Sequence, residues 1–166
     1  MKNRYLNKVT RFVIHSFAHS LILTLLLTSC YQENDVVADL WDSKGLVPNV
    51  SVWGVGTATG YKTATTVTVA PGASANLYLQ YFAPTGIDVK EIRLLQRIGA
   101  ATAPTTALST IAGSTGKFDQ TARQLVVEVP ITAPNTRNAT MTVFIDPVGS
   151  NDLVGARRTV TIRTTP

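Results

Sequence analysis

The sequence predicts an all-β fold, an antiparallel β-sandwich of about seven or eight short strands. Apolar and polar residues alternate over many short segments, which places one face of each strand in a core and the other in water. Turn-forming combinations of proline, glycine and asparagine separate these segments at regular intervals. Threonine and valine, which suit strands, are abundant. Strands with one wet face favour two packed sheets.

The predicted strands follow one another along residues 47–166, the predicted domain. In chain order they cover residues 50–55, 63–69, 75–82, 89–98, 124–129, 139–146 and 157–163, and a weaker strand or loop covers 103–111. Pro130 and Pro134 confine the chain after residue 129 to an edge strand or a loop, because proline cannot donate to a strand ladder. Residues 147–155 are rich in turn formers and predict a loop.

Residues 89–98 fit two patterns. Ile92 and Leu95 have helical spacing, and Asp88 before them is a suitable N-cap. Ile92 and Leu94 also alternate with charged residues, as in a half-buried strand. The strand-rich surroundings favour the strand, and the helix stays open as the alternative.

The first thirty residues have the layout of a secretory signal peptide. Four basic residues and no acidic residue precede a short apolar segment, residues 20–27. This segment is too short to span a bilayer, which takes about 20 apolar residues. It ends in Leu27-Thr28-Ser29-Cys30, an apolar residue, two small residues and the one cysteine of the chain. These four residues resemble the lipobox of bacterial lipoproteins.

The resemblance to a lipobox implies what happens on both sides of Cys30. Residues 1–29 are then the cleaved signal peptide, Cys30 carries the lipid, and residues 30–46 form a tether to the domain. Two or more acyl chains anchor a protein stably, so the membrane is the first expected partner. The alternative is an uncleaved anchor in which the cysteine is incidental.

The residues after Cys30 suggest the destination. Position 31 is tyrosine, whereas aspartate there favours inner-membrane retention in enterobacterial lipoproteins. Glu33 and Asp35 follow, and a short acidic stretch in this place resembles the surface-export tether of lipoproteins from the Bacteroidota. The resemblance implies a lipid-anchored protein of the outer membrane, exposed at the cell surface.

Removal of residues 1–29 changes what the composition predicts. The whole chain has a formal net charge of +5, but four of its fifteen basic residues and none of its ten acidic ones lie in the signal peptide. The mature chain, with eleven basic and ten acidic residues, gives no reason to expect nucleic acid as a partner. Both histidines are removed too, so histidine catalysis, Cys–His sites and the usual zinc sites are excluded. We expect no catalytic residue, metal or cofactor.

The order of the last strands, the Pro71-Gly72 turn before residues 75–82 and the threonine-rich last strand resemble the immunoglobulin-like domains of small Bacteroidota lipoproteins. The likeness covers about residues 47–164. The cysteine pair and strand tryptophan of antibody domains are missing, so it concerns the sandwich shape. It implies an immunoglobulin-like β-sandwich with a non-catalytic binding or accessory role, such as surface glycan capture or support of an outer-membrane complex. A glycan or another envelope protein is then the second expected partner.

Exposed aromatic side chains are the main candidates for binding. If one face of residues 75–82 is buried, Tyr78 and Phe82 face outward on the other. Trp41, Trp53 and Tyr61 lie near the first strand and are close enough to its end to reach the surface. Flat exposed rings stack on sugars or anchor protein partners, so Tyr78, Phe82 and Trp53 are the predicted ligand-binding residues. The alternative is that these rings pack beneath the tether or another strand.

Two other functions are alternatives. A fibre or adhesion subunit would assemble by β-strand addition, with residues 157–163 as the donated strand. A small hydrolase is the least expected, because it needs two carboxylates facing each other across a cleft. The candidate acids Asp88, Glu91, Asp146 and Asp152 are scattered along the chain.

Overall fold

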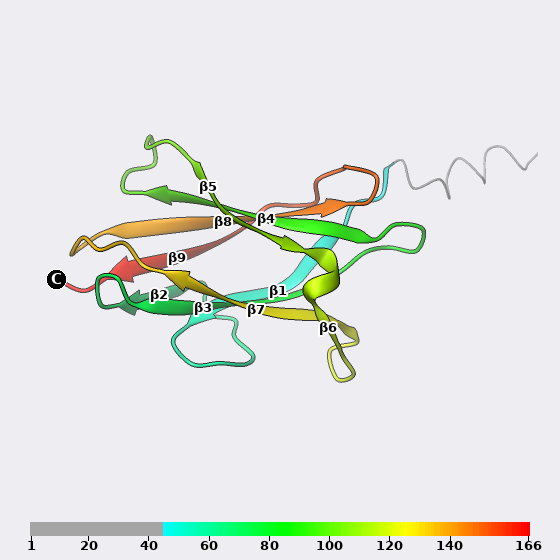
Figure 1. The fold of residues 1–166 in the computed structure, drawn as a ribbon, viewed down its shortest axis with the longest axis horizontal. Helices are drawn as coiled ribbons and strands as arrows, with labels where there is room; N and C mark the ends of the chain where they lie inside the picture. Colours follow the sequence, from blue (N-terminus) through cyan, green and yellow to red (C-terminus); the bar gives the residue numbers. More distant parts are fainter. Residues whose placement is uncertain (1–44) are drawn as a thin grey trace, which may run out of the picture. The chain divides into compact units, whose positions relative to one another are not determined.

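Two β-sheets packed face to face make up residues 45–166, the part of the chain that this computed structural model describes (Figure 1). The predicted signal peptide, the lipobox and nearly all of the predicted tether precede residue 45 and lie outside the described residues. Residues Ser43–Pro166 form one compact unit, and the predicted domain falls within it. From residue 45 onward, no helix is long and apolar enough to span a membrane.

The strand order is that of an immunoglobulin domain. The four-stranded sheet has the order β1 (Asn49–Gly56), β3 (Ser74–Phe82), β7 (Gln124–Thr132) and β6 (Lys117–Asp119). The five-stranded sheet has the order β2 (Thr66–Val69), β9 (Arg158–Thr164), β8 (Thr140–Gly149), β4 (Val89–Ile98) and β5 (Thr106–Ala112). Immunoglobulin strands A, B, E and D share one sheet, and C, F and G the other. Here the sheet β1-β3-β7-β6 corresponds to strands A, B, E and D, and β4, β8 and β9 correspond to strands C, F and G. The predicted immunoglobulin-like sandwich is therefore confirmed.

The number and direction of strands differ from the prediction. Residues 45–166 contain nine strands rather than seven or eight. One of the additions, β6, has only three residues, too few for a visible alternation. The sandwich is also not wholly antiparallel, because β2 runs parallel to β9 at one edge of the five-stranded sheet.

Two prolines lie inside strands. β7 continues through Pro130, where its ladder with β6 has already ended at Val126, so this proline lies at an open edge as predicted. β8 continues through Pro147, so the loop predicted for residues 147–155 starts too early. The ladder between β8 and β9 ends at Ile145, and the missing N–H of Pro147 therefore removes no bond to β9.

The ambiguous segment, residues 89–98, is the strand β4. It lies between β8 and β5 and pairs with both, which excludes the helical alternative. The weak segment predicted at 103–111 forms β5 from Thr106 onward. A register shift opposite Leu94 and Leu95 leaves Leu108 of β5 as a bulge residue.

The core lies between the sheets and takes alternate residues from strands of both. Leu77, Leu79 and Tyr81 of β3 are fully buried, as the alternation predicts. Ile92 and Leu94 of β4 belong to the same cluster of buried side chains. Each fully buried aliphatic side chain contributes about 1.5–3 kcal/mol relative to its exposed state, so this core stabilises the domain without a disulfide.

Candidate functional site

The three predicted binding aromatics lie in three separate hollows of the surface. Tyr78 lines the largest of the three, with a volume of about 440 Å³. Trp53 lines a second of about 210 Å³, and Phe82 lines a third of about 230 Å³. The structure therefore does not bring these residues together into one aromatic platform.

The largest hollow, the Tyr61 hollow, lies on the outer face of the four-stranded sheet. Its lining residues come from β1, β3, the β1–β2 loop, β6 and the turn after it: Val52, Tyr61, Tyr78, Gln80, Asp119, Thr121 and Ala122. The register pairs Gln80 with Val52 and Tyr78 with Gly54. These β3 side chains alternate with the core residues of the same strand, which is why they reach the opposite face.

Tyr78 points to the outer face as predicted, but it is not exposed. Only 7% of the residue is accessible, because Tyr61 covers it edge-on with the ring centroids 5.6 Å apart and the ring planes at 70°. Lys62 Nζ lies 5.9 Å from the centroid of the same ring. The prediction of an exposed Tyr78 is therefore wrong, and the covering segment is the β1–β2 loop.

Tyr61 provides the exposed ring of this hollow, with 67% of the residue accessible. Strand alternation could not identify it, because it lies in the loop between β1 and β2. The local composition indicates exposure of this ring: Tyr61 follows four small residues, 57–60, whose side chains are too short to cover it. Tyr61 lies near the first strand in the sequence but is not among the predicted ligand-binding residues.

Gly54 allows the β1–β2 loop, residues 57–65, to lie against β1. A Cβ at Gly54 would lie 2.5 Å from the carbonyl oxygen of Lys62, closer than such atoms can approach. Beside this contact, the N–H of Val55 donates to the carbonyl of Ala64 at 2.7 Å. The loop therefore covers part of the free edge of β1 and carries Tyr61 over β3.

Glu128 of β7 holds the loop on both sides of Tyr61. Its Oε2 accepts a hydrogen bond from the Gly60 N–H at 3.0 Å, and its Oε1 accepts one from Lys62 Nζ at 2.5 Å. Lys62 Nζ also donates to the Gly60 carbonyl at 2.9 Å. Gly60 has a φ of +91°, which favours glycine. We call Glu128, Gly60 and Lys62 the Glu128 clamp.

The clamp also sets the ionisation of its carboxyl group. Partial burial raises the pKa of Glu128, but the hydrogen bonds from Lys62 and Gly60, together with the positive charge of Lys62, lower it by more, so the net pKa lies below the ordinary value. The Lys62 side chain is only 8% exposed and that of Glu128 27%, which makes this the most enclosed of the ion pairs found in residues 45–166. Glu128 is therefore ionised at neutral pH.

The floor of the Tyr61 hollow is polar. Gln80 Nε2 donates to Tyr78 Oη at 2.9 Å, and the phenol, as the acceptor of this bond, keeps its own hydrogen to donate. Asp119 Oδ1 accepts from the N–H groups of Thr121 and Ala122, both at 2.8 Å, and thereby fixes the turn after β6. An exposed ring above a phenol, an amide and a carboxylate can bind a ligand by stacking and hydrogen bonding.

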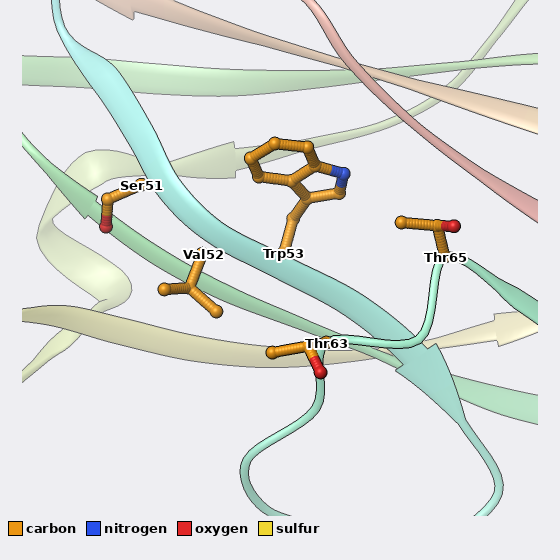
Figure 2. A pocket seen from close by; sticks show the side chains of 5 residues that line it. All are labelled: Ser51, Val52, Trp53, Thr63 and Thr65. Atoms are coloured by element: carbon orange, nitrogen blue, oxygen red, sulfur yellow. The ribbon is translucent and has the colours of Figure 1, made fainter.

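Trp53 faces the core side of β1, opposite Leu79, and projects from the strand on the side opposite Val52 (Figure 2). The Arg158 guanidinium lies over its ring, 4.6 Å from the centroid. Within residues 45–166 its buried indole nitrogen has no hydrogen-bond partner, and Figure 2 shows this nitrogen on the side of the ring nearer Thr65. One face of the ring is thus already occupied, so Trp53 is not the open platform that the sequence predicts.

Phe82 is exposed as predicted, with 37% of the residue accessible. It lines the third hollow together with Phe118, which is 57% exposed, and with the charged residues Asp88 and Arg123. The two rings come from the end of β3 and from β6. This hollow is a second, smaller aromatic site, and no residue of the β1–β2 loop lines it.

Three of the four carboxylates considered for a hydrolase are engaged in ion pairs. Asp146 accepts two bonds from Arg157, and Asp152 pairs with Lys90. Glu91 pairs with the neighbouring Arg93 in the five-stranded sheet. Among residues 45–166, no group of three or more histidine, cysteine, aspartate or glutamate side chains could hold a metal ion.

Comparison with known proteins identifies no family. No family model and no curated protein matches the chain. Among solved structures, the chain is similar to a superoxide reductase (neelaredoxin) from Ignicoccus hospitalis T24K, with a TM-score of 0.42 and 8% identity over 74% of this chain and 84% of that one. It is also similar to a family 123 glycoside hydrolase from Clostridium perfringens, with a TM-score of 0.30 and 10% identity over 69% of this chain and 27% of that one. At these TM-scores neither likeness bears on function.

Proposed function

We propose that this protein is a lipid-anchored lipoprotein of the outer membrane that captures glycans at the cell surface without catalysing a reaction. The observation that carries the proposal is the Tyr61 hollow, in which an exposed ring stands above a polar floor. The anchor rests on the lipobox Leu27-Thr28-Ser29-Cys30. The surface location rests on the polar, partly acidic tether that follows it.

The chemistry of the Tyr61 hollow suits a sugar ring. A sugar presents an apolar face of C–H groups and a rim of hydroxyl groups, so it needs both an aromatic surface and hydrogen-bonding partners. Tyr61 supplies the surface, with 67% of the residue open to solvent. The Tyr78 phenol supplies a donor, and the Gln80 amide and Asp119 carboxylate supply further polar groups at the floor.

The strand-addition alternative finds less support in the fold. Its proposed donor, residues 157–163, corresponds to β9, which pairs with β8 on one side and β2 on the other. Donation to another subunit would break both ladders. A partner in solution would therefore reach the surface hollows more easily than the terminal strand.

We expect Tyr61→Ala to weaken glycan binding about tenfold. A ring contact of ~1.5 kcal/mol corresponds to about this factor in the dissociation constant. The detergent-solubilised protein would first be screened on a glycan array, and the best ligand would then be titrated calorimetrically into wild type and variant. Phe118→Ala is the matched control, because this ring is similarly exposed at 57% but lies in another hollow.

The outcomes separate the expected partners. Loss of binding in Tyr61→Ala with Phe118→Ala unchanged supports glycan capture at the Tyr61 hollow. Loss in the Phe118 variant alone would move the site to the third hollow, which Phe82 and Phe118 line. Absence of binding to every glycan on the array would refute glycan capture and leave an envelope protein as the partner.

A further inference from the structure

We propose that Glu128 is the positioning residue of the Tyr61 hollow: its carboxylate holds the β1–β2 loop in place and so keeps the Tyr61 ring over Tyr78. The effect on ligand binding rests on the proposed function, whereas the effect on the loop does not. Glu128 lines neither the Tyr61 hollow nor the two other hollows. It acts through the loop residues that it binds.

The geometry assigns this role because the two residues that contact Glu128 are the neighbours of Tyr61 in the sequence, one on each side. One contact is made by residue 60 and the other by residue 62, so residue 61 has little freedom to move away. Each carboxylate oxygen takes one contact, and the two loop residues are also bonded to each other through Lys62 Nζ and the Gly60 carbonyl. Loss of the carboxylate removes both bonds that flank Tyr61, and leaves the loop bonded to the sheet through the Ala64 carbonyl, which accepts from Val55, and the Ala58 carbonyl, which accepts from Asn76.

The clamp is built on paired β-strands. Glu128 is paired with Tyr78 in the ladder between β7 and β3, so the carboxylate and the covered ring rise from neighbouring positions of one sheet. Gly54 admits the loop backbone, and the aliphatic part of Lys62 packs beside Gly56, where a Cβ would meet Lys62 Cδ and Cε at 3.3 Å. The loop is therefore supported along β1 and tied at β7, with Tyr61 between the two.

The charges around the carboxylate favour its ionised form. Lys62 from the loop contacts it directly, and Lys117 of β6 lies on the same face, opposite Val126, two residues before Glu128. The other titratable groups on this face are the carboxylate of Asp119, also on β6, and the phenols of Tyr61 and Tyr78. Because the pKa of Glu128 is lowered on folding, the stability from this group is present above the unfolded value of about 4.3 and is lost as pH falls through the folded value. We expect the clamp to hold from pH 5 to 8 and to open only when the pH falls below the ordinary pKa range of a glutamate.

Hydrogen exchange of the loop tests the structural claim without any ligand. Peptides that cover residues 57–65 would be followed by mass spectrometry in the full-length protein. We expect Glu128→Ala to speed exchange of the Gly60 amide about tenfold, because a bond worth ~1.4 kcal/mol is lost. Glu91→Ala is the matched control: it removes another paired glutamate with a 24% exposed side chain, in the other sheet.

Further variants keep the test informative if Glu128→Ala folds poorly. Glu128→Gln removes the charge but leaves an oxygen for the Gly60 N–H, and Lys62→Met keeps the packed aliphatic stem without the ammonium group. Both are expected to speed loop exchange by less than Glu128→Ala. Unchanged loop exchange in these folded variants, or loss of wild-type protection between pH 5 and 8, would overturn the role of Glu128.

Ligand affinity then separates positioning from general stability. We expect Glu128→Gln to weaken glycan binding in the wild-type background and to have no further effect in a Tyr61→Ala background. Additive losses would contradict positioning through Tyr61. If loop exchange responds to Glu128 but no glycan binds, the clamp stands and the proposed function fails.

Discussion

A Cys30→Ala variant is expected to lose lipid labelling completely and to leave the membrane fraction. In the proposed lipoprotein the thiol of Cys30 is the point of lipid attachment, and the alanine side chain cannot form a thioether. Without acyl chains, the mature chain keeps no anchoring segment that the sequence predicts. Metabolic labelling with a radioactive fatty acid, followed by membrane fractionation, measures both effects.

A conservative change in the same motif provides the control. Thr28→Ser keeps a small residue in the lipobox, so labelling and fractionation should match the wild type. If Cys30→Ala still sediments with membranes after a carbonate wash, the apolar segment before it is an uncleaved anchor. The lipoprotein interpretation would then be wrong, although the fold of residues 45–166 would be unaffected.

Tyr81→Ala is expected to lower the free energy of unfolding by about 3–5 kcal/mol, the range for removing a buried aromatic side chain. Tyr81 is fully buried in the core, and its hydroxyl donates to the Gly113 carbonyl at 2.8 Å, where η2 (Gly113–Thr115) leads from β5 to β6. The loss is a large part of the ~5–15 kcal/mol that stabilises a typical domain. Urea denaturation followed by tryptophan fluorescence measures it.

Two neighbouring variants show whether the loss comes from the core. Tyr81→Phe keeps the ring and loses only the hydrogen bond, so we expect a decrease of about 1 kcal/mol. Tyr61→Ala removes a largely exposed ring and should change stability by less than about 1 kcal/mol. A Tyr81→Ala effect no larger than that of Tyr61→Ala would mean that the two sheets do not pack around this residue.

The fold could be predicted because strand alternation reports which side chains are buried. On β3 the pattern placed Leu77, Leu79 and Tyr81 inside, and all three are in the core. The same pattern failed for Tyr78, since alternation gives the direction of a side chain and not what lies over it. The covering residue, Tyr61, comes from a loop whose path depends on contacts with Gly54 and with β7.

Irregular strands explain the other errors. A register shift between Val50 and Val52 of β1 places Val50 and Trp53 on the same side of the strand although they are three residues apart. Simple alternation cannot detect such a bulge, and so it could not direct Trp53 to the core. The Glu128 clamp was also beyond sequence reasoning, because it joins residues more than sixty positions apart through side-chain geometry.

A titration of the isotopically labelled protein with its tightest-binding glycan, followed by amide NMR shifts, tests the binding site most directly. The account predicts saturable shifts concentrated in residues 57–65 and 119–122 and at Gln80, around the Tyr61 ring. Saturable shifts centred on Phe82 and Phe118, or on the five-stranded sheet, would contradict it.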